Sequence, residues 1–258
     1  MNSKSAGGFF RRIIVCIAIA SGYVAMILPS QAADVRAAIA ANFTEPAREI
    51  AVLFENATGH KLIANFGSTG QFYAQITQGA PFDILLAADR STPAKAVRDG
   101  LAVADSIFTY ATGRLVLFSL DKNRTLNAAT LKDGAFDKIA VANPATAPYG
   151  AAAVETMLNL DVLSLLKPKF VQGNSIAQAY QFVASGNAEL GFVAMSQTMT
   201  SNSGSRWLVP ADLHTPIAQD AVLLKQGAGK EAVHAFLTFL RSPEARQVIA
   251  KYGYEVAG

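Results

Sequence analysis

The residues best suited to chemistry in this sequence lie where predicted strands end and predicted helices begin. Four such loops occur, at 40–44, 67–70, 143–150 and 173–175. Ligands of open α/β sheets bind beyond the carboxyl ends of the strands, and the unpaired N–H groups of a helix N-terminus favour an anion. The side chains at these ends are all neutral: Asn42, Thr44, Ser68, Thr69, Tyr149, Asn174 and Ser175. The pattern predicts a site that holds an oxyanion by hydrogen bonds rather than by opposite charge.

Each of these loops, taken alone, has a simpler interpretation. Serine, threonine and asparagine are the ordinary residues that cap a helix N-terminus. The recurrence of such loops in both halves of the chain is what favours a binding site.

Patterns typical of catalysis are missing from the sequence. The serine-hydrolase elbow needs Gly-x-Ser-x-Gly, and the segment 67–70 has the wrong spacing. His60, His214 and His234 are far apart and show no metal-ligand spacing, so we expect them to be structural. Asp83 and Asp89 flank an apolar strand and are expected to be turn and cap residues. We therefore expect a protein that is not an enzyme and that needs no cofactor or resident metal.

The N-terminus is typical of a secretory signal peptide. Lys4, Arg11 and Arg12 precede an apolar run, 13–28, and small residues follow up to Ala32. A membrane anchor is the alternative, but the run is short and is interrupted at 21–23. We expect residues 1–32 to be removed on export to the periplasm.

The charge of the chain argues against nucleic acid as a partner. Its 22 lysines and arginines exceed its 19 aspartates and glutamates by three, and three basic residues fall in the signal segment. The exported part of the chain therefore has no net charge, and it lacks the excess of lysine and arginine that binds phosphate backbones. The single cysteine, Cys16, also lies in the signal, so no disulfide is expected in the exported part.

Strand and helix patterns alternate along the rest of the chain, which predicts an α/β fold with mostly parallel sheets. The strands are expected at 34–43, 62–66, 83–87, 115–118, 139–142, 191–195 and 217–224. Residues 119–135 are polar and rich in turn residues. Strands 115–118 and 217–224 are candidates for crossing between two lobes, and one large doubly wound domain is the alternative.

The loops also resemble those of a known family, the periplasmic molybdate-binding proteins of ABC transporters. The resemblance runs through most of the exported chain, and the order and spacing of its motifs carry it. These motifs are Ala41-Asn42-Phe43-Thr44, Gly67-Ser68-Thr69-Gly70, Gly79-Ala80-Pro81-Phe82-Asp83, Ala87-Ala88-Asp89, Asn143-Pro144, Ala147-Pro148-Tyr149-Gly150, Asn174-Ser175-Ile176, Gly191-Phe192-Val193-Ala194 and Lys251-Tyr252-Gly253-Tyr254.

The resemblance implies a type II periplasmic-binding fold, with two lobes joined by two hinge strands. Lobe I would comprise residues 33–113 and 219–258, and lobe II residues 114–218. The implied oxyanion contacts are Asn42, Ser68, Thr69 and the main-chain N–H groups of Tyr149 and Ile176. Many members have serine at the position of Asn42 and tyrosine at that of Ala194; this chain resembles a subgroup with asparagine in the first loop.

The function implied is capture of molybdate or tungstate and delivery to the membrane permease of an ABC transporter, by a monomer. Molybdenum would be bound only as molybdate, through those same residues. Another tetrahedral oxyanion (sulfate, thiosulfate or phosphate) is the first alternative. A secreted enzyme on the same scaffold, and a sensor that works without a permease, are the others.

Overall fold

The computed structural model describes residues 32–199 and 204–256. The expected signal peptide therefore lies outside the described residues, apart from Ala32. Within the described part, helices and strands alternate as the α/β prediction requires, and the strands form two five-stranded sheets. No helix of this part has both the length and the hydropathy that crossing a bilayer requires.

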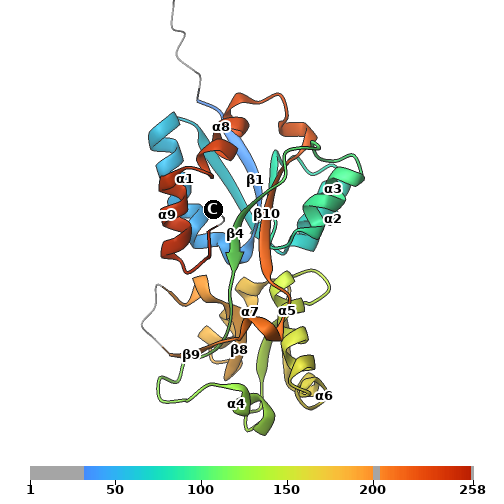
Figure 1. Cartoon of the computed structure of the whole chain (residues 1–258), viewed down its shortest axis with the longest axis vertical. Coiled ribbons are helices and arrows are strands. Elements are labelled where there is room, and N and C mark those ends of the chain that lie inside the picture. Colours follow the sequence, from blue (N-terminus) through green and yellow to red (C-terminus); the bar gives the residue numbers. More distant parts are fainter. Residues whose placement is uncertain (1–31, 200–203, 257–258) are drawn as a thin grey trace, which may run out of the picture. The chain divides into compact units, whose positions relative to one another are not determined.

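The first sheet has the order β2-β1-β3-β10-β4 (Figure 1). Its first three strands are parallel, and β10 is antiparallel to both of its neighbours. A register irregularity between Gln219 and Asp220 interrupts the pairing of β10 with β4. The strands are β1 (Asp34–Ala40), β2 (Lys61–Gly67), β3 (Ile84–Leu86), β4 (Phe108–Gly113) and β10 (Ile217–Leu223).

The second sheet repeats this arrangement, with the order β7-β6-β8-β5-β9. Strands β6, β7 and β8 are parallel, and β5 is antiparallel to β8 and β9. The chain passes between the sheets from β4 to β5 and again from β9 to β10. The strands are β5 (Leu115–Ser119), β6 (Ile139–Ala142), β7 (Phe170–Gly173), β8 (Leu190–Ala194) and β9 (Ser205–Leu208).

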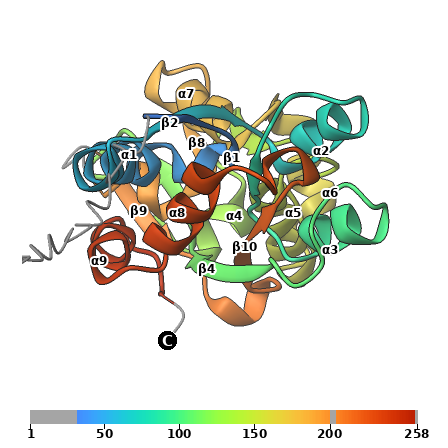
Figure 2. The ribbon, with the colours of Figure 1, turned by 90° about the horizontal axis from the view of Figure 1, so that it is seen from above.

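Helices cover both faces of the first sheet (Figure 2). Ile39 packs with helices α1, α8 and α9 on one face, whereas its neighbour Ala38 packs with α2 and α3 on the other. Because successive strand residues point to opposite faces, both must be apolar when both faces are covered. These helices are α1 (Thr44–Thr58), α2 (Thr69–Thr77), α3 (Ser91–Arg98), α8 (Glu231–Phe239) and α9 (Pro243–Lys251).

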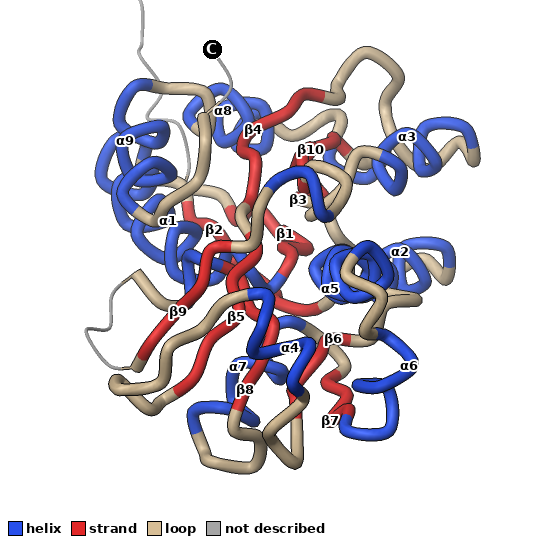
Figure 3. Tube along the Cα trace, turned by 60° about the horizontal axis from the view of Figure 1, so that its bottom comes forward, coloured by secondary structure: helices blue, strands red, loops and turns tan. Residues whose placement is uncertain are grey.

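A single hydrophobic core holds the second sheet and its helices together. Figure 3 shows α5 and α6 beside β6, and α7 beside β8. The helices are α4 (Ala128–Asp133), α5 (Pro148–Asn159), α6 (Leu163–Leu166) and α7 (Ile176–Ala184). Short 3-10 turns complete the chain: η1 (Ala41–Phe43), η2 (Lys167–Lys169), η3 (Met195–Gln197), η4 (Ala211–Leu213) and η5 (Lys225–Gly227).

Local sequence signals define the ends of several helices. Helix α1 ends at Gly59, which adopts φ 75° and donates its N–H to the Glu55 carbonyl. Ser242 caps α9 through the N–H of Ala245, with Pro243 in the first turn. The segment 119–135, which is polar and rich in turn residues, also contains α4, where Asn127 and Thr130 form a reciprocal capping box.

The aromatic packing of α1 supports a testable prediction about the first sheet. Phe54 is fully buried and lies edge-on to Phe236, with 5.2 Å between ring centroids. Phe54→Ala should lower the free energy of unfolding by ~3–5 kcal/mol through lost burial and a cavity. Val52→Ala on the same helix, where Val52 is 59% exposed, should change it by less than ~0.5 kcal/mol. Urea denaturation measures both variants, and equal losses would contradict this account of the core.

Candidate functional site

A small cavity lies where loops of the two sheets meet. The loops after β1, β2 and β3 line it from the first sheet, and the first turns of α5 and α7 line it from the second. Its volume is about 10 Å³, far below the ~300–1,000 Å³ typical of pockets for organic ligands. Its lining, which includes no charged residue, is Ala40, Ala41, Asn42, Gly67, Ser68, Thr69, Ala88, Ala147, Pro148, Tyr149 and Ile176.

All five residues predicted to contact an oxyanion line this cavity. Asn42, Ser68, Thr69, Tyr149 and Ile176 come from four separate loops, and each is at most 4% exposed. The other loop residues serve local structure. The hydroxyl of Thr44 donates to the Ala41 carbonyl, Ser175 accepts the N–H of Gln178, and the Asn174 N–H is bound by the Gln178 side chain.

Ser68 distinguishes this cavity from an ordinary set of helix caps. It occupies the N-cap position of α2, yet its side chain makes no capping hydrogen bond. Its Oγ is buried and has no hydrogen-bond partner, with the residue only 3% exposed. A buried hydroxyl without a partner costs roughly 1–3 kcal/mol, so the fold holds a donor that a ligand in the cavity can satisfy.

Thr69 has the same location but a fixed orientation. Its Oγ1 accepts the N–H of Ala88, at the end of β3, over 3.0 Å. Because an oxygen that accepts this bond keeps its own hydrogen, the Thr69 hydroxyl can still donate to a ligand. The parallel pairing of β1 with β2 and β3 places these loops at one edge of the sheet.

Helices α5 and α7 contribute main-chain donors from the second sheet. Tyr149 and Ile176 lie in their first turns, where N–H groups have no acceptor within the helix. Gly150 allows α5 to begin against β6, since a Cβ there would lie 2.2 Å from the Ala142 carbonyl oxygen. The positive ends of two helix dipoles therefore meet at a cavity that no cationic side chain lines.

The side-chain amide nitrogen of Asn42 forms hydrogen bonds with other protein side chains, so it is not free to bind a ligand in the cavity. Nδ2 donates to Gln219 Oε1 and to the Tyr254 hydroxyl, each over 2.9 Å. An Asn42 amide that replaced the hydroxyl of the tyrosine absent at Ala194 would therefore have to break these bonds. Ala194 itself is buried in β8, and its N–H donates to Gln197.

Sequence reasoning missed the buried polar residues behind the cavity. We name as the Asn42 network the hydrogen-bonded side chains of Asn42, Tyr110, Tyr149, Ser196, Gln219 and Tyr254. Burial raises the pKa of the Tyr110, Tyr149 and Tyr254 hydroxyls, so all three remain neutral donors. The one signal in the sequence was the polar pair Gln219-Asp220 inside the otherwise apolar predicted strand 217–224.

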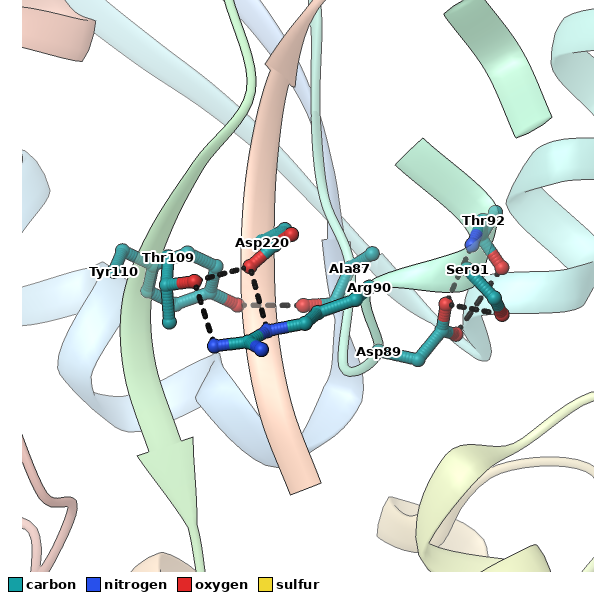
Figure 4. Close-up of polar contacts among 8 residues, drawn as sticks. All are labelled: Ala87, Asp89, Arg90, Ser91, Thr92, Thr109, Tyr110 and Asp220. Atoms are coloured by element: carbon teal, nitrogen blue, oxygen red, sulfur yellow. Dashed lines mark hydrogen bonds and ion pairs between the residues drawn. The ribbon is translucent and has the colours of Figure 1, made fainter. Parts of the chain in front are cut away.

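A larger cavity adjoins the small one and shares Ala88, Ala147 and Pro148 with it. Its charged groups are held by their neighbours (Figure 4). The carboxylate of Asp89 accepts the N–H of Thr92 over 2.6 Å, as its predicted capping role requires. Arg90 lies 3.9 Å from the Asp220 carboxylate. Neither group is among the residues that line the small cavity.

Metal and acid–base chemistry find no support in the described residues. No group of three histidine, cysteine or carboxylate side chains in that part of the chain is placed to hold a metal ion. The three histidines bond to main-chain groups, as the structural interpretation predicted: His60 to Ala33, His214 to Thr215 and His234 to Ala228. Asp83 is buried and pairs with Lys230 and the N–H of Arg36.

The chain with this cavity of neutral donors matches a known protein family. The model of the bacterial extracellular solute-binding protein family matches residues 35–255. This chain belongs to that family. The solute-binding proteins of this family are not a family of enzymes, and the family's name places its members outside the cytoplasm.

Two curated relatives and one solved structure resemble this solute-binding protein over nearly all of its length. The molybdate-binding protein ModA of Rhodobacter capsulatus is 54% identical, over 89% of this chain and 91% of that protein. ModA of Azotobacter vinelandii is 50% identical, over 92% and 96%. A solved periplasmic molybdate-binding protein of Azotobacter vinelandii superimposes with a TM-score of 0.84 at 36% identity, covering 87% of this chain and all of the other. This likeness confirms the periplasmic-binding-protein fold.

The approach of α5 to β6 generates a prediction for this solute-binding protein. Gly150→Ala should lower the free energy of unfolding by ~1–3 kcal/mol, because the added Cβ has backbone on one side and cannot be accommodated by side-chain motion. Gly229→Ala is the matched control, since a Cβ there meets no atom within 4 Å. Chemical denaturation measures both, and a Gly150→Ala variant as stable as the control would show that α5 does not need this close approach.

Proposed function

We propose that the chain captures molybdate or tungstate outside the cytoplasm and delivers it to the membrane permease of an ABC transporter. The observation that carries the proposal is the unpartnered hydroxyl of Ser68, buried in a cavity that two helix N-termini face. The names of the relatives, molybdate-binding proteins at 54% and 50% identity, support the choice of ligand. The site would need no cofactor and no resident metal, because molybdenum enters as the oxyanion.

The proposed contacts divide between side chains and main chain. Ser68 and Thr69 donate through their hydroxyls, and Tyr149 and Ile176 through their N–H groups. Asn42 contributes through its main-chain N–H at the start of η1, because its amide hydrogens are already donated. Hydrogen bonds to a charged acceptor are shorter and stronger than neutral ones, so several neutral donors in a dry cavity can hold a dianion.

Selection among oxyanions then rests on size. The donors are fixed by strands and helix ends, so a smaller anion such as sulfate would leave some of them too distant to bond. Each buried donor left unpaired costs about 1–3 kcal/mol. A cavity without lysine or arginine also gains nothing from charge alone, which reduces binding of unrelated anions.

Release would follow a hinge motion of two lobes. Lobe I comprises residues 33–113 and 219–258, and lobe II residues 114–218. The hinge would lie at the β4–β5 and β9–β10 connections. The two separate sheets, which the chain connects only at these two places, support this division. The N–H of Gly70 donates to the Thr146 carbonyl over 2.9 Å at the rim of the cavity. A bond of this kind favours the closed arrangement, and the ligand adds to it by binding that arrangement better. We propose a monomer, in the periplasm, that binds without turnover and has no nucleic-acid partner.

The direct test replaces the unpartnered hydroxyl. Ser68→Ala should weaken molybdate binding by ~10–100-fold, because a hydrogen bond to a charged group is worth about 1.5–3 kcal/mol. The same change should leave the ligand-free protein as stable as before, or more so, since it removes an unsatisfied buried hydroxyl. Calorimetric titration with molybdate, tungstate, sulfate and phosphate measures the affinity, and thermal melting measures the stability.

Ser119→Ala provides the matched control. Ser119 is equally buried, at 3% exposure, but lies at the end of β5 and does not line the cavity. It should leave the affinity for molybdate unchanged. Tight binding of sulfate or phosphate in place of molybdate would replace the proposed ligand with another tetrahedral oxyanion. Binding of none of the four anions would refute the proposed function.

A further inference from the structure

The Asn42 network joins groups from both sheets directly behind the cavity. Asn42 follows β1 of the first sheet, whereas Ser196 follows β8 of the second. The hydroxyl of Ser196 donates to the Asn42 carbonyl over 2.8 Å, and the Tyr254 hydroxyl donates to the same carbonyl over 2.7 Å. These three residues are each at most 6% exposed. Ser196 therefore makes a buried hydrogen bond between the two sheets on the residue that begins the first cavity loop.

Gln219 connects this group to the other side of the cavity. Its Oε1 accepts from Asn42 Nδ2 and from the Tyr110 hydroxyl, at 2.9 and 3.0 Å, and its Nε2 donates to the Tyr149 hydroxyl at 3.3 Å. Gln219 is fully buried and stands at the irregularity of β10. Irregularities of this kind redirect a side chain from its regular strand direction.

The fit around the Tyr149 hydroxyl is tight. A Cβ on Gly113, the last residue of β4, would lie 2.0 Å from the Tyr149 hydroxyl and 2.6 Å from Gln219 Nε2. Glycine at this position therefore lets the second-sheet tyrosine reach the crossing strands. The network occupies the place where the chain passes between the sheets, and all six of its residues are buried.

We propose that Ser196 and Tyr254 are positioning residues. Ser196, in lobe II, bonds to the Asn42 carbonyl and to the Tyr254 hydroxyl, both in lobe I, and this clamp sets how slowly a bound oxyanion leaves. This inference rests on the proposed function. The clamp acts through the Asn42 carbonyl and amide, so the Asn42 side chain serves the clamp and not the anion. Opening the lobes separates Ser196 from Asn42, and the cost of breaking that buried bond is part of the barrier to release.

The prediction is a change in dissociation without a change in association. Ser196→Ala should speed dissociation of molybdate by ~3–10-fold, the range expected for loss of one buried hydrogen bond. Ser196→Ala combined with Tyr254→Phe should speed it further, since both donors to the Asn42 carbonyl are then lost. The association rate should stay within about twofold, because mutations within one interface act mostly on dissociation. Stopped-flow mixing of the protein with sodium molybdate, followed by displacement with excess tungstate, measures both rates.

Thr156→Val is the control for a purely structural effect. Thr156 is fully buried in α5, and its hydroxyl donates to the Ala152 carbonyl of the same helix. Loss of this hydroxyl should destabilise the ligand-free protein about as much as Ser196→Ala does. It should leave the association and dissociation rates of molybdate unchanged. A Ser196→Ala protein that loses stability like the control, with unaltered dissociation, would overturn the clamp while leaving the proposed function intact. A wild-type protein that binds no molybdate would overturn both.

Discussion

Hydrogen-bond donors that the protein itself leaves unpaired are the constraint on which the rest of this structure depends. Such donors are costly in a folded chain, and here one unpartnered hydroxyl and two helix N-termini lie at the same cavity. Ser68 keeps a free hydroxyl in a position where serine normally caps a helix. The first turns of α5 and α7 add main-chain N–H groups that no carbonyl of their own helices can satisfy. In the proposed function, a bound oxyanion supplies the missing acceptors.

The two sheets explain how these donors come together. Each five-stranded sheet has three neighbouring parallel strands and one strand, β10 or β5, that is antiparallel to both of its neighbours. Parallel strands place their carboxyl ends, and hence the following helix N-termini, along one edge. Because both sheets turn this edge toward the same cavity, donors from four loops reach one small space that no charged side chain lines. Behind it, the Asn42 network fills the junction with neutral tyrosine, serine and amide groups.

Much of this architecture is predictable because it depends on local patterns. Apolar strands covered on both faces, such as 84–86, and capped helices, such as α9, are apparent from residue type and spacing alone. The four loops follow from the same reasoning. Sequence could not distinguish Ser68 from Ser175, however, since both stand at an N-cap, and only the fold shows that Ser175 caps its helix whereas Ser68 does not.

The polar network was beyond prediction for a different reason. Gln219 and Tyr254 lie far from Asn42 in sequence, and their roles depend on long-range packing of the C-terminal segment against the crossing strands. Strands β4, β7 and β9 were likewise missed. All three contain polar residues, and β7 and β9 have only four residues each, so their pairing partners rather than their own sequences define them.

The most direct test of the account is the crystal structure of the exported chain with molybdate, phased to reveal the anomalous scattering of molybdenum. The account predicts one molybdenum peak in the small cavity, with oxygens bonded to Ser68, Thr69 and the N–H groups of Tyr149 and Ile176. It also predicts that no lysine or arginine contacts the ion. A peak elsewhere, or one held by a basic side chain such as Arg90, would contradict the claim that unpaired neutral donors make this site.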